Sequence, residues 1–437
     1  MTGETQMHKG WCPGARRPMR AKDGLLVRLK ISCGVLCAGA MRAIAQAGRN
    51  YGNGRFDLTS RGNLQIRGVH EDQLPYLIEP LEDLGLIDKD AAAEGVRNIL
   101  VSPLSGVDGC DHAHAAAKAL EAALAQNIDL YALPSKFGFL IDDGSALSLS
   151  GVPADVRFDW EAGEQAFLIA IGGTCKDAIA LGRCEARRIP QIAISIARSF
   201  LNLASQLPEP PRRMRGLIES CGADAIAAAS ALRVHRQQRQ SRIEASSPIG
   251  LLHLHAKYFF GAGAPFGCLD TDMLLAVANG AEMFGTDEIR LTPWRALSLL
   301  DVQLEKAQIM RDHFAAHGFI VDSEDPRLAV AACGGATTCE RGATDTRSDA
   351  LALMLSARRL WKTGVALQVF GCGKGCGRQA GTPLTLIGRG GFYDLAMDQS
   401  LAGQGVTNAN QLTFAAAREK LEALAQNTGQ PSKPDTP

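Results

Sequence analysis

"GVLCAGAMRAIAQAG", residues 34–48, aligns without a gap with "GCLDTDMLLAVANGA", residues 267–281, which places Gly34 on Gly267. A second pair, "LTSRGNLQIRGV" (58–69) and "LTPWRALSLLDV" (291–302), aligns with the same constant shift in residue number. We call this correspondence the repeat alignment. Two matching segments with one shift indicate a duplicated unit. We therefore expect two copies of one structure within the 437 residues.

Each copy reads as strand, helix, strand, helix. The opening strands are "GLLVRLKIS" (24–32) and "GLLHLHAKY" (250–258), and each precedes a segment with apolar residues at helical spacing. A second strand begins at each Leu-Thr pair, and a second helix follows over 71–86 and 302–318. This order is half of a ferredoxin-like sandwich, so we expect the two halves to complete one sheet.

An α/β segment follows each half. The first includes a helix over 111–126 and the apolar strand "AFLIAIGG" (166–173). The predicted fold class is α+β: two ferredoxin-like half-domains forming one sheet, plus two α/β domains about a pseudo-two-fold axis. The predicted parts are half-domain 1 (18–87), α/β domain 1 (88–236), half-domain 2 (249–318), α/β domain 2 (319–426) and a disordered tail (427–437).

Composition narrows the class of function. Forty-six Lys and Arg balance 46 Asp and Glu, and the pI is about 7.1, which argues against a nucleic-acid partner. We find no run of 18 apolar residues and no secretory signal, and so expect no membrane partner and a cytoplasmic protein. In a reducing compartment, the 12 cysteines are expected as thiols or metal ligands.

Two glycine-rich stretches carry paired cysteines. "ACGGATTCERG" holds Cys333 and Cys339, and "FGCGKGCGRQ" (370–379) holds Cys372 and Cys376. Four thiolates with little steric bulk around them suit an iron–sulfur cluster. Structural zinc sites have cysteines two to four residues apart, which fits the first pair poorly. The predicted ligand is one 4Fe-4S cluster in the second copy, with zinc or four unligated thiols as alternatives.

Basic residues at the start of each copy suggest a polyanionic ligand. They are Arg61, Arg67, Arg97 and Lys136 in the first copy and Arg295 in the second. Arginine captures carboxylates through two parallel hydrogen bonds, and a tetrapyrrole with several acid side chains would need several such donors. We therefore predict these five residues as substrate-binding, while the sequence singles out no catalytic residue.

These motifs resemble, in order, those of the sulfite and nitrite reductase superfamily: "LTSRGNLQIRG", "RNIL" (97–100), "LPSKF" (133–137) and the two cysteine pairs. The resemblance covers about residues 20–425. It implies that Arg61, Arg97 and Lys136 contact a tetrapyrrole or its bound anion. It also implies that Cys376 would be shared with the iron of sirohaem, if sirohaem is bound.

One departure from the reductases concerns Gly138, which stands where they carry a second lysine. That lysine helps to bind and protonate the oxyanion, so its loss weakens a reductase function. The stretches "CPGARRPMRAKDGLLVRLKI" and "IRLTPWRAL" resemble the precorrin-3B synthase family instead. That family implies oxygen- and NADH-dependent hydroxylation of precorrin-3A at C20 with closure of a ring A lactone, in aerobic cobalamin biosynthesis. An electron-donor reductase is the implied partner.

The resemblance to the synthases implies a mononuclear non-haem iron, and histidines are its candidate ligands. His253 and His255 share one face of a predicted strand and are the weak candidates. His112 and His114 are two residues apart on a predicted helix and face different sides. His317 reads as an ordinary helix end, so the pair His313 and His317 is a poorer choice.

Two other functions remain open. A small sirohaem-dependent sulfite or nitrite reductase would show an intrinsic haem-like absorption band. A non-catalytic tetrapyrrole-binding or electron-transfer protein would bind precorrin-3A without converting it.

Overall fold

The protein is described by a computed structural model over residues 12–107, 112–235, 247–254, 257–284, 287–360, 364–376, 382–397 and 409–427. The duplication is visible element by element. The first copy contains β1 (Met19–Ala21), β2 (Gly24–Leu29), β3 (Val35–Leu36), α1 (Ala38–Tyr51), β4 (Arg55–Leu58), β5 (Leu64–Val69) and α2 (Leu74–Asp83). The second contains β11 (Gly250–Leu254), β12 (Lys257–Gly263), β13 (Cys268–Asp270), α8 (Thr271–Met283), β14 (Ile289–Leu291), β15 (Ala296–Leu299) and α9 (Ala307–Ala316).

The opening strand of the second copy differs from the prediction. "GLLHLHAKY" is not one strand, because β11 ends at Leu254 and β12 begins at Lys257, and the two strands pair antiparallel. In the repeat alignment, the counterpart of β2 is β12 and that of β1 is β11. Apolar residues in both strands made the stretch read as a single strand.

The two half-domains exchange edge strands. One sheet has the order β1-β2-β5-β4-β13 and the other β11-β12-β15-β14-β3, so each sheet ends in a short strand of the other copy. Both exchanged strands pair antiparallel, Leu269 opposite Phe56 and Leu36 opposite Ile289. The predicted fold class is confirmed. The half-domain strands form two interlocked five-stranded sheets, where we expected one.

Each copy continues into an α/β part with the same strand order. The first sheet contains β6 (Ile99–Val101), β7 (Phe139–Asp142), β8 (Ala154–Glu161), β9 (Ala166–Gly173) and β10 (Ile179–Cys184). The second contains β16 (Val330–Ala332), β17 (Leu367–Phe370), β18 (Leu384–Arg389), β19 (Phe392–Met397) and β20 (Ala409–Leu412). In both, the first three strands are parallel and the last two antiparallel.

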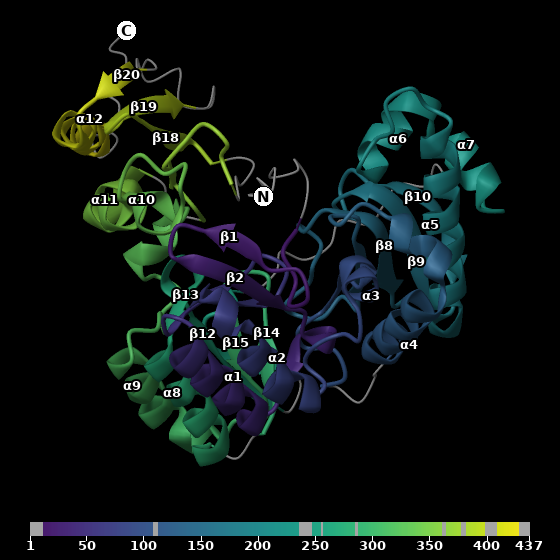
Figure 1. Ribbon diagram of the computed structural model, residues 1–437, viewed down its shortest axis with the longest axis horizontal. Coiled ribbons are helices and arrows are strands. Elements are labelled where there is room, and N and C mark those ends of the chain that lie inside the picture. Colours follow the sequence, from purple (N-terminus) through teal and green to yellow (C-terminus); the bar gives the residue numbers. More distant parts are fainter. Residues whose placement is uncertain are drawn as a thin grey trace, which may run out of the picture.

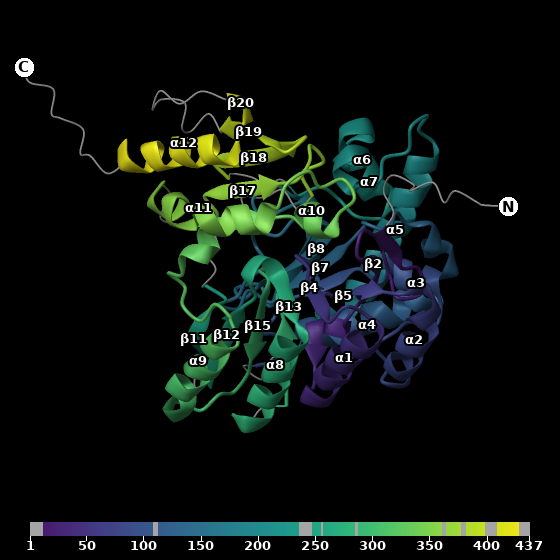
Figure 2. The same cartoon turned by 60° about the vertical axis from the view of Figure 1, so that its left-hand side comes forward.

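Helices accompany these sheets. They are α3 (Ala91–Val96), α4 (His112–Gln126), α5 (Ile189–Ser205), α6 (Met214–Cys221) and α7 (Ala223–Ala229) in the first part, and α10 (Gly335–Thr338), α11 (Thr346–Leu360) and α12 (Phe414–Asn427) in the second. In Figure 1 the first α/β part lies to the right of the half-domains and the second lies above them. Figure 2 shows α11 and α12 stacked over the half-domains from a second side.

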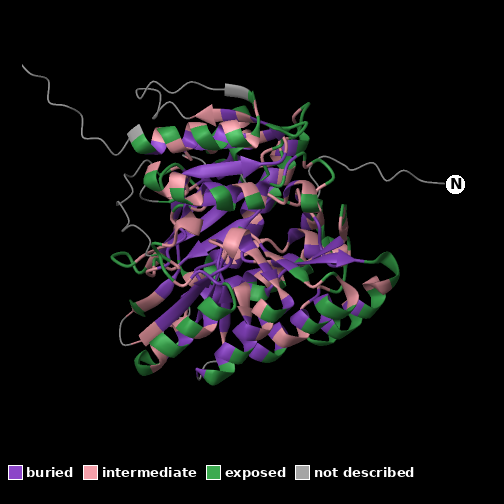
Figure 3. Ribbon diagram, turned by 90° about the vertical axis from the view of Figure 1, so that its left-hand side faces the viewer, coloured by how far each residue is buried: buried purple, intermediate pink, exposed green. Residues whose placement is uncertain are grey.

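One hydrophobic core joins the two half-domains. It includes Ile44 of α1, Val277 of α8, Leu64 of β5 and Leu297 of β15. Each α/β part has a large core of its own. Figure 3 shows buried strands inside and exposed faces on the outer helices. The boundaries of the four predicted domains remain a prediction. The predicted disordered tail lies outside the described residues, which end at Asn427.

Among the described helices, we find none with the length and apolar character needed to cross a bilayer.

Candidate functional site

The two cysteine stretches meet at one edge of the second α/β sheet. Cys333 follows β16 directly, and Cys372 lies shortly beyond the end of β17. The two strands are parallel neighbours, so their carboxyl ends lie at the same edge. The Gly371 N–H donates to Cys333 Sγ at 3.2 Å, which ties the second stretch to the first.

The Cys376 thiol lies within electrostatic reach of the other three cysteines of the two stretches. Burial raises the pKa of the Cys376 thiol, Lys374 opposes that shift, and Cys372, Cys333 and Cys339 add to it because neighbouring thiolates repel. The backbone around them is tightly folded: a Cβ added at Gly342 would lie 2.2 Å from the carbonyl carbon of Gly335.

No tight single-ion site is present in the part of the chain that the structure describes. There, no three His, Cys, Asp or Glu side chains come close enough to hold one metal ion. This holds for Cys333, Cys339, Cys372 and Cys376 too, so their arrangement gives no support to zinc. The donors of a four-iron cube stand further apart than those of one ion, and four thiols from two loops at one sheet edge suit the cube.

Arg61 and Lys136 come together in the structure. Arg61 lies in the turn between β4 and β5, and its Nη2 donates to the Lys136 carbonyl at 3.2 Å. A Cβ at Gly138 would lie 3.6 Å from Arg61 Nη1, so position 138 faces this guanidinium. The Lys136 side chain is exposed.

Two further arginines, which the sequence analysis missed, surround Arg61. Burial lowers the pKa of Arg61, Arg213 and Arg28 lower it further, and Cys12 and Asp155 oppose them. Arg213 Nε contacts both Asp155 oxygens at 3.0 Å. Arg28 donates to the Gln65 side-chain oxygen at 2.8 and 2.6 Å when that amide is oriented toward it.

Two other arginines, Arg213 and Arg28, act on the Arg61 guanidinium, and Asp155 offsets part of their field. Asp155 also accepts the N–H groups of Gly138 and Met214. Partly buried, incompletely neutralised arginines favour an anionic ligand. Apolar and basic residues alternate in "VRLKI", which predicts a strand with its basic residues on one face. This alternation is the sequence signal that could have drawn attention to Arg28.

Arg295 lies in a second basic group. Burial lowers its pKa, while neighbouring Cys268 and Asp57 raise it and Arg347 lowers it. Arg347 Nη2 pairs with Asp57 at 3.3 Å. Arg347 Nε is buried and has no hydrogen-bond partner among the described residues, so an anion oxygen could satisfy it.

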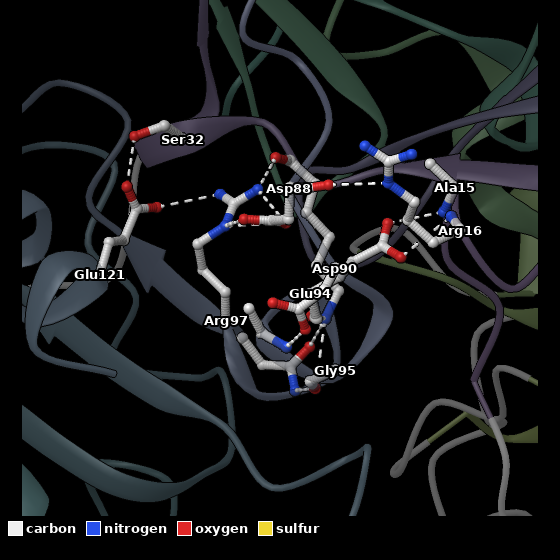
Figure 4. Close-up of polar contacts among 12 residues, drawn as sticks. Ala15, Arg16, Ser32, Asp88, Asp90, Glu94, Gly95, Arg97 and Glu121 are labelled. Atoms are coloured by element: carbon white, nitrogen blue, oxygen red, sulfur yellow. Dashed lines mark hydrogen bonds and ion pairs between the residues drawn. The ribbon is translucent and has the colours of Figure 1, made fainter. Parts of the chain in front are cut away.

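Arg97, which the sequence predicts to bind substrate, is engaged by other residues of the chain in this structure. It caps the end of α3 and pairs with Asp88 at 2.8 Å and with Glu121 at 3.3 Å, and it donates to the Lys30 carbonyl at 2.7 Å (Figure 4). Nearby, Glu94 accepts the backbone N–H groups of two N-terminal residues, Ala15 and Arg16. The Arg97 guanidinium is therefore occupied by the carboxylates of Asp88 and Glu121, and it links the segments that carry them.

Arg67 is likewise engaged. Its side chain is 8% exposed and pairs with Asp23 at 2.7 Å and Asp57 at 2.8 Å. Burial alone would lower its pKa, yet the two carboxylates raise that pKa above its usual value. Its remaining contact is to the Thr338 carbonyl at 3.1 Å. Substrate binding by Arg67 stays a prediction; in this structure its guanidinium is held by Asp23 and Asp57.

The candidate histidines do not converge. His253 is exposed and stacks on Tyr258 with ring centroids 4.6 Å apart, so it does not face an interior site. His255 lies outside the described residues. His112 stacks on Trp160, whereas His114 Nε2 lies 2.7 Å from Arg290 Nη1.

The His313 ring contacts the Ala276 carbonyl, and the His317 ring contacts the backbone of His313. With His112 and His114 directed to different partners, the described residues offer no ligand set for a non-haem iron.

Comparisons with known proteins show what the chain is similar to. The family described as "Nitrite/Sulfite reductase ferredoxin-like half domain" matches twice, over residues 17–84 and 253–317. The chain is 29% identical to a precorrin-3B synthase of Sinorhizobium sp over 94% of this chain and 88% of that one. It is 23% identical to the chloroplastic ferredoxin–nitrite reductase of Arabidopsis thaliana, covering 81% of this chain and 65% of the reductase.

The fold has a solved counterpart. The NirA protein of Mycobacterium tuberculosis superposes with a TM-score of 0.76 and 19% identity, over 94% of this chain and 82% of NirA. The repeated half domain and this likeness agree with the two interlocked sheets and the two matching α/β parts. The chain therefore carries two copies of the ferredoxin-like half domain that is described for nitrite and sulfite reductases.

Proposed function

We propose that this chain is an oxygen- and NADH-dependent monooxygenase that converts precorrin-3A to precorrin-3B. The reaction hydroxylates C20 and closes a lactone from the ring A acetate; one oxygen atom of O₂ enters the product and the other leaves as water, with NADH oxidised. We further propose a cytoplasmic enzyme served by an electron-donor reductase.

The observation that carries this proposal is the pairing of Arg61 with Gly138. Position 138 faces the Arg61 guanidinium at 3.6 Å, so the second lysine of the reductases would stand beside it. With glycine there, the site keeps cations for carboxylates but has one lysine fewer to bind and protonate a small oxyanion. The similarity to the Sinorhizobium precorrin-3B synthase along nearly the whole chain supports the same substrate.

The residues assigned to the substrate are arginines and one lysine. We propose that Arg61 and Lys136 bind tetrapyrrole carboxylates, together with Arg28 and Arg213. Asp155 orients Arg213 through two contacts at 3.0 Å, which fixes the direction of that fork. Burial of Arg61 excludes water, so each charged hydrogen bond to a carboxylate is stronger than at the surface. Arg295 and Arg347 are the proposed second carboxylate group.

We propose that Cys333, Cys339, Cys372 and Cys376 hold a 4Fe-4S cluster. Such a cluster supplies electrons one at a time. The convergence of the four thiols at one sheet edge and the Gly371 N–H at Cys333 Sγ support this assignment. The described residues fit no mononuclear iron, and we assign no step to one.

A sirohaem-dependent nitrite or sulfite reductase is the second candidate, favoured by the plant reductases among the relatives and by the NirA-like fold. In it, Cys376 would be the thiol shared with haem iron. A third candidate is a tetrapyrrole carrier without catalysis.

One experiment separates the three. The protein is reconstituted anaerobically, its iron and acid-labile sulfide are counted, and its visible spectrum is recorded before and after addition of precorrin-3A. Oxygen, NADH and a reductase are then added, and the mass of the product is measured by mass spectrometry. A gain of one oxygen atom supports the monooxygenase. An intrinsic haem-like band with nitrite or sulfite reduction overturns it, and binding without conversion indicates a carrier.

A further inference from the structure

An ionic cluster joins half-domain 1 to the cysteine-bearing α/β part. At its centre Asp57 of β4 pairs with Arg67 of β5 at 2.8 Å and with Arg347 of α11 at 3.3 Å. Arg67 also pairs with Asp23 at 2.7 Å. The Arg67, Asp23 and Asp57 side chains are 8%, 15% and 19% exposed, so the network is largely shielded from solvent. Shielded, bidentate arginine pairs hold their geometry better than surface pairs.

Arg67 of this cluster and the nearby Lys22 hydrogen-bond to the backbone of the first cysteine loop. Arg67 Nη2 donates at 3.1 Å to the carbonyl of Thr338, the residue before Cys339. Lys22 Nζ donates at 2.7 Å to the carbonyl of Ala336. Both carbonyls belong to α10, the short helix between Cys333 and Cys339. Two cations from the half-domain therefore fix the segment that presents two of the four thiols.

The second copy has a comparable junction without cysteines. Asp57 corresponds to Arg290 in the repeat alignment. Arg290 Nη1 lies 3.3 Å from the Pro103 carbonyl and 2.7 Å from His114 Nε2, both in the first α/β part. The same repeat position thus connects each half-domain to an α/β part, but only the Asp57 junction, within the described residues, touches a loop that bears the paired cysteines.

We propose that Arg67 is a positioning residue for the iron–sulfur centre: it holds the Cys333–Cys339 loop against half-domain 1 and thereby sets the reduction potential of the cluster. The inference rests on the proposed 4Fe-4S assignment. Arg67 is suited to this role because its planar fork serves two carboxylates and one carbonyl at once. The ammonium of lysine cannot meet all three.

The test uses Arg67→Lys, which keeps a positive charge beside the carboxylates of Asp23 and Asp57. A second variant, Arg67→Met, removes the charge altogether. Arg290→Lys is the matched control, because it makes the same substitution at the other junction. Hydrogen–deuterium exchange of residues 334–342 is measured on the purified proteins. The midpoint potential is measured on reconstituted proteins by redox titration followed with electron paramagnetic resonance.

In Arg67→Lys we expect exchange in this loop to rise by about tenfold, the equivalent of one lost charged hydrogen bond. Arg67→Met should also shift the midpoint potential to a more negative value, because a positive charge near the centre is lost. Arg290→Lys should change neither. Unchanged exchange and potential in both Arg67 variants overturn the proposal, and so does an equal change in Arg290→Lys.

Failure of the cluster assignment would look different. If the parent protein assembles no cluster, the proposed function fails, while the exchange measurement on the purified chain still decides whether Arg67 holds the loop.

Discussion

Gly62 and Arg295 occupy the same position in the two copies and share one backbone conformation, with φ of 63° and 59°. The repeat thus preserves a left-handed turn after β4 and after β14. Left-handed backbone costs an L-residue such as arginine roughly 1 kcal/mol more than glycine. In the second copy this strained position is Arg295, and its side chain lies beside Cys268 and Asp57. Strain kept at such a position indicates a role for the guanidinium.

Replacing Arg295 should therefore separate stability from binding. In Arg295→Gly, relief of backbone strain offsets the lost packing, so we expect the unfolding free energy to stay within about 1 kcal/mol. Affinity for uroporphyrin, a stable tetrapyrrole polycarboxylate, should fall about tenfold by fluorescence titration. Asp301→Gly is the control, since Asp301 (φ 55°) corresponds to Gly68 (φ 66°). Equal affinity in the Arg295→Gly variant and its parent would remove Arg295 from the site.

Arg61→Ala tests the first basic group directly. Loss of a partly buried charged hydrogen bond should weaken uroporphyrin binding by about 1–3 kcal/mol, which is a rise in Kd of roughly 5- to 150-fold. The same titration on Arg187→Ala serves as the control, because Arg187 is exposed and pairs with Glu185. A Kd that does not move with Arg61→Ala would contradict the assignment.

Cys372→Ser and Cys339→Ser take one ligand from each cysteine stretch. Either change should abolish the broad visible absorption and most of the bound iron and acid-labile sulfide, because a cube with three thiolates is poorly held. Cys221→Ser should keep a full cluster, since that thiol lies on α6 in the first α/β part, where Sγ donates to the Leu217 carbonyl at 3.2 Å. A full complement of four irons in both site variants would refute the ligand set.

His114 should make stability depend on pH. Burial, then Arg290 and Lys118, lower its pKa from 6.5 to about 3, so the folded protein keeps the ring neutral. Below pH 6.5 the unfolded chain binds a proton that the folded chain does not, and stability falls as the pH falls toward 3. The slope from this residue is up to about 1.4 kcal/mol per pH unit.

Urea unfolding at pH 7, 6 and 5 checks this expectation. The stability advantage of the parent over His114→Gln should shrink as the pH falls. A constant difference between the parent and His114→Gln across this range would show that the ring titrates alike in both states.

The sequence alone indicated the duplication, the ferredoxin-like half domains and the four-thiol pattern. These features can be recognised from the spacing of residues along the chain. The repeat alignment keeps one constant shift because α1 and α8 bury equivalent faces in one shared core. The cysteine pairs follow two strands that lie side by side, so adjacency in the sheet reproduces their order in the chain. Glycine at position 138 was likewise visible without a structure.

Only the tertiary structure decided which cations are available. Arg97 and Arg67 look like anion ligands in the sequence, but Asp88, Glu121, Asp23 and Asp57 neutralise them. Arg28 and Arg213 have no motif in common, yet folding brings both beside Arg61.

The exchange of β3 and β13 between the two sheets could not be predicted from the sequence either. It depends on which strand pairs with the edge of each sheet in the folded chain. Ion pairing follows distance and burial in three dimensions, and neither is encoded in the spacing of charges along the chain.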